Sequence, residues 1–144
     1  MKVWMFALAI GLFATFCVRA DDKPRYPIDV WYDKAMDQTN GSTYAMIDVE
    51  GKAYEKWDAE LNVVYQHLLH KLNAQDQVKL QEAERSWIAW RDSESAFSNQ
   101  FWPNASGGQM GTLDRWAAIH EKVGTIRGRV IQLMGYEEDL AHPP

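Results

Sequence analysis

The sequence predicts an all-α fold, an antiparallel three-helix bundle with a short extra helix on the N-terminal side. Apolar residues recur at alternating spacings of three and four over three long segments, which is the period of one helix face. No run of strand length alternates apolar and polar residues with β-branched enrichment, and no internal repeat is present. The pattern therefore indicates helices and gives no support for a sheet.

The first 20 residues have the pattern of a secretory signal peptide. Lys2 precedes an apolar run that ends at Val18, and the chain turns acidic directly after Ala20. The run is too short for a comfortable membrane span, and Val18 and Ala20 are the small residues that a signal peptidase needs. We expect cleavage after Ala20, no membrane contact afterwards, and a single periplasmic or secreted domain over residues 21–144.

Composition and charge limit the class of partner. Beyond Ala20, 13 of the 15 basic residues remain against 20 acidic ones, so the mature net charge is about −7. This charge argues against nucleic acid and favours a cationic partner, because opposite net charges accelerate encounter. Cys17 is the single cysteine and leaves with the leader, so the mature domain has no disulfide. Lipidation of Cys17 is disfavoured because the bulky Phe16 precedes it.

The first two helices are expected on either side of a polar break. Asp29 suits the N-cap of a short helix that ends near Gln38, and residues 40–42 interrupt the chain. A long helix is predicted over residues 43–72. Gly51 weakens its first half by about 1 kcal/mol relative to alanine, so a kink or a later helix start there is an open alternative. Its apolar stripe is Tyr54, Trp57, Leu61, Val64, Leu68 and Leu72.

Two further long helices complete the predicted bundle. Asn73 is expected to cap the first of them after a tight turn, which makes an antiparallel hairpin with the preceding helix. Residues 102–111 should stop this helix and form the longest loop. The last helix should run from a Thr112 cap to Gly135, followed by a frayed acidic tail. The stripes are Leu80, Ala83, Trp87, Trp90, Phe97 and Phe101, with Glu94 out of pattern, and then Trp116, Ile119, Val123, Ile126, Val130 and Leu133.

Tryptophan is abundant, and its distribution separates core from surface candidates. A buried indole contributes a large apolar area, so the tryptophans that fall on the stripes are expected in the core. Trp31 and Trp102 lie outside the stripes. They are candidates for partner contacts or for covering the bundle ends. The expected core tryptophans are Trp57, Trp87, Trp90 and Trp116.

Two phrases on the predicted hairpin carry the most specific pattern. The first is Asp-x-x-Leu-Asn-x-x-Tyr and the second is Trp-x-x-x-Arg-Asp. With these phrases the chain resembles the LprI-like family of small secreted helical domains. The resemblance implies a lysozyme inhibitor that acts by non-covalent protein binding, and it implies no enzymatic activity. The phrases are formed by Asp58, Leu61, Asn62 and Tyr65, and by Trp87, Arg91 and Asp92.

The resemblance also implies roles and departures. The phrase residues are expected to be mainly structural, with Arg91 and Asp58 as a buried pair and Asn62 satisfying leftover donors; a partner-binding role is the alternative. Lysozymes are commonly basic, which suits the acidic mature chain. Family members often carry cysteines, and alignment places the missing ones near Tyr32, Val49, Ser95 and His120. Two other functions remain open: an envelope scaffold or stress module, and a peptidoglycan-fragment binder, both without lysozyme affinity.

Catalytic and metal chemistry receive little support from the sequence. Asp92 and Glu94 are two residues apart on a helix, so their carboxylates point in different directions and cannot flank one bond. His67 and His70 share a helix face, but no third ligand stands nearby in sequence, and solvated histidines are the better interpretation. We expect no cofactor, no metal and no catalytic residue.

The loop at residues 102–111 is the predicted partner surface. Its glycines expose backbone, and Trp102 and Met110 offer apolar anchors. Asn104 and Ser106 add small polar groups. If the loop is a plain connection, the helix face around Asp92 and Glu94 is the next candidate.

Overall fold

The computed structural model describes residues 25–105 and 107–142, which form four helices and contain no strand. They are α1 (Pro27–Asp37), α2 (Thr43–Lys71), α3 (Ala74–Ala105) and α4 (Thr112–Ala141). The all-α class is therefore confirmed. The predicted signal peptide lies outside the described residues. No helix in the described part of the chain is long and apolar enough to cross a membrane.

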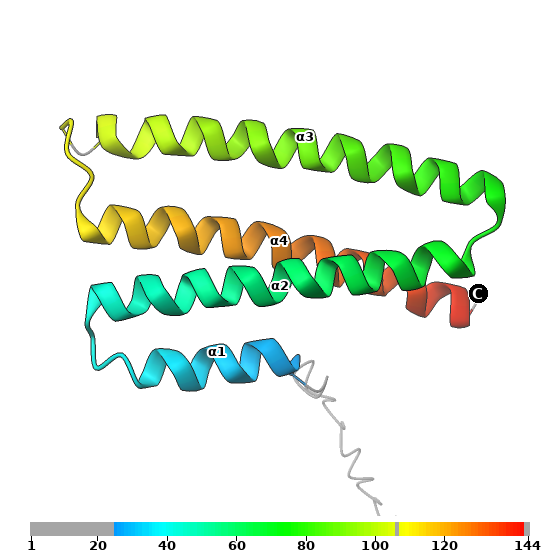
Figure 1. Cartoon of the computed structure of the whole chain (residues 1–144), viewed down its shortest axis with the longest axis horizontal. Coiled ribbons are helices and arrows are strands. Elements are labelled where there is room, and N and C mark those ends of the chain that lie inside the picture. Colours follow the sequence, from blue (N-terminus) through cyan, green and yellow to red (C-terminus); the bar gives the residue numbers. More distant parts are fainter. Residues whose placement is uncertain (1–24, 106, 143–144) are drawn as a thin grey trace, which may run out of the picture.

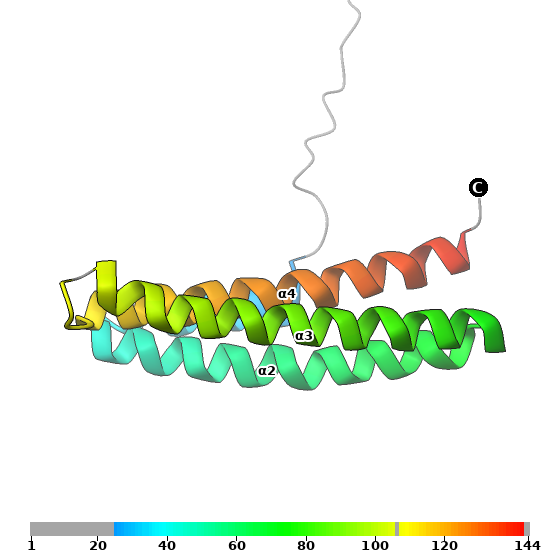
Figure 2. The same ribbon diagram turned by 90° about the horizontal axis from the view of Figure 1, so that it is seen from above.

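The long helices alternate in direction along the chain. α2 and α4 run the same way, α3 runs antiparallel to both, and α1 lies beside α2 in the opposite direction (Figure 1). Seen from above, α3 runs over the pair formed by α2 and α4 (Figure 2). The most extensive packing is between α2 and α4. The backbone of α3 packs more closely on α4 than it does on α2.

The boundary between α2 and α3 follows the sequence prediction. α2 continues through Gly51 without a break. The N–H of Asp76 donates to Oδ1 of Asn73 at 3.0 Å, so Asn73 caps α3 as expected.

The predicted cap of the first helix was wrong: α1 begins at Pro27, and Asp29 lies inside its first turn. A proline suits that position because its missing N–H would have no helical partner.

The end of α3 differs from the prediction. The helix passes through Trp102 and Pro103 and ends at Ala105, so the loop is shorter than expected. The stop is made by glycines: Gly107 and Gly108 have φ of 75° and 95°, and the N–H of Gly108 donates to the Pro103 carbonyl at 2.8 Å. Two residues of positive φ turn the chain out of the helix, which Pro103 in the last turn does not.

Both predicted ends of α4 were wrong. Its N-cap is Gly111, one residue before Thr112, and the N–H of Gly111 donates to the Asp114 carboxylate at 2.9 Å. At the other end α4 continues through Gly135 to Ala141. Lys71 of α2 pairs with Glu137, which holds these last turns against the bundle.

The apolar core lies between α2 and α4. The second-helix stripe predicted from the sequence supplies one side and the last-helix stripe supplies the other, and both predictions are confirmed for the central residues. Burying these side chains is the main stabilising contribution. The buried members of the predicted stripes are Trp57, Leu61, Val64 and Leu68 from α2 and Val123, Ile126, Val130 and Leu133 from α4.

α3 presents a partly polar face to this core, which confirms Leu80 and Trp87 of the predicted stripe and corrects the rest. Trp90, Phe97 and Phe101 are 52%, 60% and 46% exposed, and Ala83 is exposed too. The positions that face inward are Leu80, Glu84 and Ser98, with Trp87 partly buried. The inward face was misassigned because its polar members find partners on α4: Arg129 pairs with Glu84, and Ser98 donates to Glu121. The three long helices therefore do not contribute equally to the apolar core, because most of its buried side chains come from α2 and α4.

α1 is held to the bundle by polar contacts and by Ile28, Trp31 and Tyr32, which are partly buried and pack against the core. Arg127 of α4 donates to both carboxylate oxygens of Asp29, at 2.8 and 2.7 Å. The Tyr26 hydroxyl donates to Glu60. Although α1 contains no buried residue, these ties fix it beside α2.

A buried carboxylate joins α1, α2 and α4. Glu50 is fully buried, and one of its oxygens accepts from the Tyr32 hydroxyl at 2.6 Å and from Nδ1 of His120 at 2.8 Å. Burial raises the pKa of Tyr32, and the hydrogen bond to Glu50 raises it further, so the phenol stays a donor. The Tyr32 hydroxyl oxygen lies 3.4 Å from Nδ1 of His120. Two positions assigned to missing family cysteines thus meet here in a polar cluster.

Candidate functional site

Five residues of the two sequence phrases converge on one groove between α2 and α3. The groove has a volume of about 460 Å³. Its lining combines carboxylates, guanidinium groups and amides with three apolar or aromatic side chains. Trp87 and Asp92 stand outside the lining, on the same helix as Arg91. The lining residues are Asp58, Leu61, Asn62, Tyr65, Gln81, Glu84, Arg85, Ile88 and Arg91.

Arg91 does not form the predicted pair with Asp58. Its Nε and Nη2 donate to Oδ1 of its neighbour Asp92 at 3.0 and 2.8 Å, and its guanidinium lies 5.4 Å from the Trp87 ring centroid. Asn62 donates to the backbone carbonyl of Asp58 at 2.9 Å and not to the Arg91 network. Partial burial acts to lower the pKa of Arg91, but the hydrogen bond to Asp92 and the charges of Tyr54, Asp92 and Asp58 outweigh it and raise that pKa.

The buried ion pair of the fold is Glu84 with Arg129. Nε and Nη2 of Arg129 donate to one Glu84 oxygen at 3.0 and 2.7 Å, and Nη1 donates to Gln132 at 2.7 Å. It joins α3 to α4, whereas the sequence prediction placed the buried pair between Arg91 on α3 and Asp58 on α2. The spacing in the sequence gave no signal for this pair, because its partners lie 45 residues apart.

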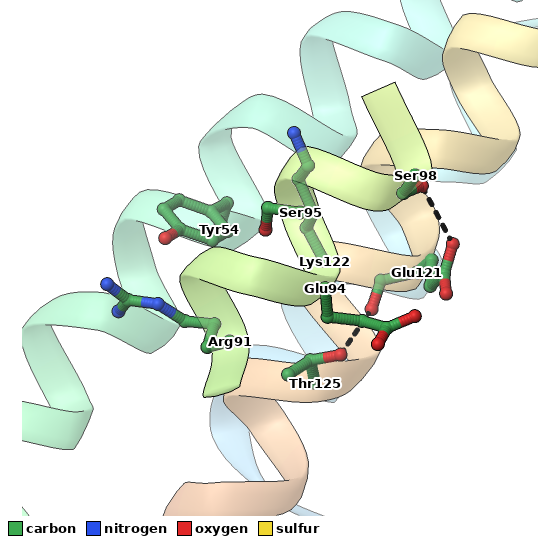
Figure 3. Close-up of a pocket in the computed structure, with 8 residues that line it drawn as sticks. All are labelled: Tyr54, Arg91, Glu94, Ser95, Ser98, Glu121, Lys122 and Thr125. Carbon is green, nitrogen blue, oxygen red and sulfur yellow. Dashed lines mark hydrogen bonds between the residues drawn. The ribbon is translucent and has the colours of Figure 1, made fainter. Parts of the chain in front are cut away.

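A narrow polar cavity separates α3 from α2 and α4 (Figure 3). Ser98 donates to Glu121 at 3.3 Å, and the Thr125 hydroxyl donates to the Glu121 backbone carbonyl at 3.0 Å. Glu94, one of the predicted contact residues, lines this cavity. With a volume of about 20 Å³ the cavity has room for a water molecule and not for a larger ligand.

The C-terminal end of α3 displays an aromatic surface. Phe97 and Phe101 stack at 5.6 Å, and Phe101 meets Trp102 edge-on at 5.4 Å. A hollow of about 530 Å³ is lined by Phe97, Gln100, Phe101, Asn104 and Ala105. We name the exposed residues Trp90, Phe97, Phe101 and Asn104 the α3 aromatic surface.

The predicted contact residues fall partly on this surface. Trp102 is half-buried at its edge and Asn104 is exposed on it, although both belong to α3 and not to a loop. Met110 is half-buried in the connection to α4, and Asp92 is exposed two residues after Trp90, so the two side chains point to different sides of α3. Ser106 lies outside the described residues. The sequence analysis missed Phe97 and Phe101 as surface residues. The signal that could have found them is Glu94, a charged residue within the apolar stripe that was predicted to face the core.

Comparison with known proteins places this geometry in a family. The family model described as Lysozyme inhibitor LprI matches residues 34–133. The chain belongs to the LprI family. The match covers α2, α3 and most of α4, including both sequence phrases and the α3 aromatic surface.

One solved structure and the curated proteins complete the comparison. A crystal structure of an uncharacterized protein from Burkholderia thailandensis is similar, with a TM-score of 0.71, 26% identity and 83% of this chain covered. This chain spans 57% of that protein's chain. None of the curated proteins matches. Among the described residues, no group of three or more His, Cys, Asp or Glu side chains is arranged to hold a metal ion.

Proposed function

We propose that the mature domain is a secreted or periplasmic lysozyme inhibitor that binds a basic lysozyme through the α3 aromatic surface. Membership of the LprI family is the observation that carries the inhibitory function. No covalent step is required, because an inhibitor acts by occupying or covering the enzyme.

The α3 aromatic surface supports the location of the contact. Aromatic side chains dominate the energetics of protein interfaces when they lie near the centre of a contact. Phe97 and Phe101 are large, exposed and stacked on one another, so little side-chain freedom remains to be lost on binding. Asn104 at the edge of the hollow adds a polar group that can donate or accept.

Charge supports the choice of partner. The mature chain carries a net charge of about −7, which attracts a basic enzyme and repels a second copy of the inhibitor. Asp92 adds an exposed carboxylate on another side of α3, which contributes to the overall negative charge. Electrostatic attraction of this kind acts mainly on the association rate and weakens as salt screens it.

A turbidity assay tests the function. Purified mature protein is mixed with a basic lysozyme and a suspension of bacterial cell walls, and the rate of clearing is recorded. We expect clearing to slow at low salt and to recover between about 0.01 and 0.1 M salt, as the Debye length falls from about 30 to about 10 Å. Unchanged clearing at a large molar excess, for lysozymes of several types, would contradict the proposal.

A further inference from the structure

The groove between α2 and α3 contains polar groups that the fold does not use. Its volume of about 460 Å³ is within the range of small-ligand sites. Asp58 and Tyr65 on α2, and Gln81 and Arg85 on α3, make no side-chain hydrogen bond to any residue in the described part of the chain. Their convergence in one hollow provides a set of donors and acceptors for a ligand.

The remaining charges of the groove are already matched inside the protein. Glu84 is neutralised by Arg129 at 2.7 Å, and Arg91 by Asp92 at 2.8 Å. This leaves one acid and one base free for direct contacts, the Asp58 carboxylate on the α2 wall and the Arg85 guanidinium on the α3 wall.

The surroundings of these two groups leave them available. Asp58 lies near enough to Arg91 to raise its pKa, yet the guanidinium donates to Asp92. Glu82 accepts a hydrogen bond from Lys79 at 2.9 Å, which lowers its pKa, and the charge of Arg85 lowers that pKa further, but no hydrogen bond joins Glu82 to Arg85.

We propose that the α2–α3 groove binds a short peptide with free termini, its amino group on Asp58 and its carboxylate on Arg85. A guanidinium suits a carboxylate because its fork of N–H groups donates two parallel bonds. The Gln81 amide and the free carbonyl of Asn62 then serve the peptide groups between the two ends. Leu61, Tyr65 and Ile88 supply apolar contacts for small side chains.

A neutral glycan fits this lining less well. It would cover one carboxylate and one guanidinium without an opposite charge for either, and unpaired charges are costly once water is removed. A zwitterionic peptide pairs both. Sugar rings also stack on exposed indoles, and no tryptophan lines the groove, although Trp87 and Trp90 lie on the same helix.

The test uses trialanine, titrated into the mature protein and followed by isothermal calorimetry and by amide chemical shifts. We expect saturable binding, with the largest shifts in residues 58–65 and 81–91. Acetylating the amino end or amidating the carboxyl end should each weaken binding tenfold or more. Asp58→Asn should abolish the difference between trialanine and its acetylated form, and Arg85→Gln the difference between trialanine and its amide.

Matched controls separate a local effect from a general change of charge. Glu55→Gln on α2 and Arg115→Gln on α4 alter exposed residues outside the groove and should leave trialanine binding unchanged. Melting temperatures confirm that each variant folds. Absence of saturable binding at millimolar trialanine, equal binding of the blocked peptides, or binding of tri-N-acetylglucosamine in place of trialanine would overturn the proposal. Lysozyme inhibition is measured separately, because the groove and the α3 aromatic surface share no residue.

Discussion

Replacing Arg129 should destabilise the fold more than replacing Arg91. Arg129 is buried, and two of its three hydrogen bonds go to the buried Glu84 at 3.0 and 2.7 Å. Arg129→Ala strands that carboxylate, which costs about 3–5 kcal/mol. Arg91 pairs with Asp92, whose side chain is 63% exposed, so water can replace the lost bond. With the contact to Trp87 included, Arg91→Ala should cost about 1–2 kcal/mol.

Thermal unfolding of the two variants measures this difference. For a domain of this size about 1 kcal/mol corresponds to roughly 4 °C, so Arg129→Ala should lower the Tm by roughly 12 °C or more and Arg91→Ala by roughly 4–8 °C. The double variant Glu84→Leu/Arg129→Leu should recover much of the loss, because it removes both buried charges. A larger loss for Arg91→Ala than for Arg129→Ala would refute the pairing described above.

Three other predictions follow from burial, charge and the end of α3. Phe97→Ser/Phe101→Ser should shift the Tm by less than roughly 4 °C because the two residues are 60% and 46% exposed, whereas a loss of roughly 10 °C or more would mean that α3 buries its aromatic stripe. Because the folded-state pKa of Tyr32 is raised above its ordinary value of about 10, its contribution to stability is complete below pH 10 and declines above it, as the unfolded chain ionises first. Urea unfolding between pH 8 and 11 should show this decline, and Tyr32→Phe should reduce it while Tyr44→Phe, at a residue 72% exposed, should not; equal profiles for the two variants would exclude the explanation. Replacing residues 104–110 with a Gly/Ser linker should weaken lysozyme inhibition by removing Asn104, and unchanged inhibition would exclude Asn104 from the contact.

The sequence predicted the α2–α4 core because periodicity and burial agree there. Trp57, Leu61 and Leu68 repeat at helical spacing and are buried. It failed on part of α3 because the inward face includes polar residues: Glu84 and Ser98 are buried and are satisfied by partners on another helix. Periodicity reports where apolar residues lie, and it cannot report that polar residues find partners across the bundle.

The candidate site was predicted only in part, because spacing in the sequence identifies residues and not their partners. The phrase residues were recognised by their spacing, and five of them do meet in one groove. Their predicted contacts were wrong, because Arg91 donates to its sequence neighbour Asp92 and not to Asp58 across the hairpin. A periodic pattern cannot distinguish between these two partners. Phe97 and Phe101 were assigned to the core because the apolar stripe, which faces inward at Leu80 and Trp87, was extended to them along α3.

Inhibition by the Phe97→Ser/Phe101→Ser variant tests the central claim most directly. The assay records cell-wall clearing by a basic lysozyme at low salt, with Val78→Ser as control, since Val78 is an exposed apolar residue at the opposite end of α3. The wild-type protein and the control should inhibit equally, and the double variant should need at least about tenfold more protein for the same effect, as expected for loss of central aromatic contacts. Equal inhibition by all three proteins, with unchanged melting temperatures, would contradict the assignment of the lysozyme contact to the α3 aromatic surface.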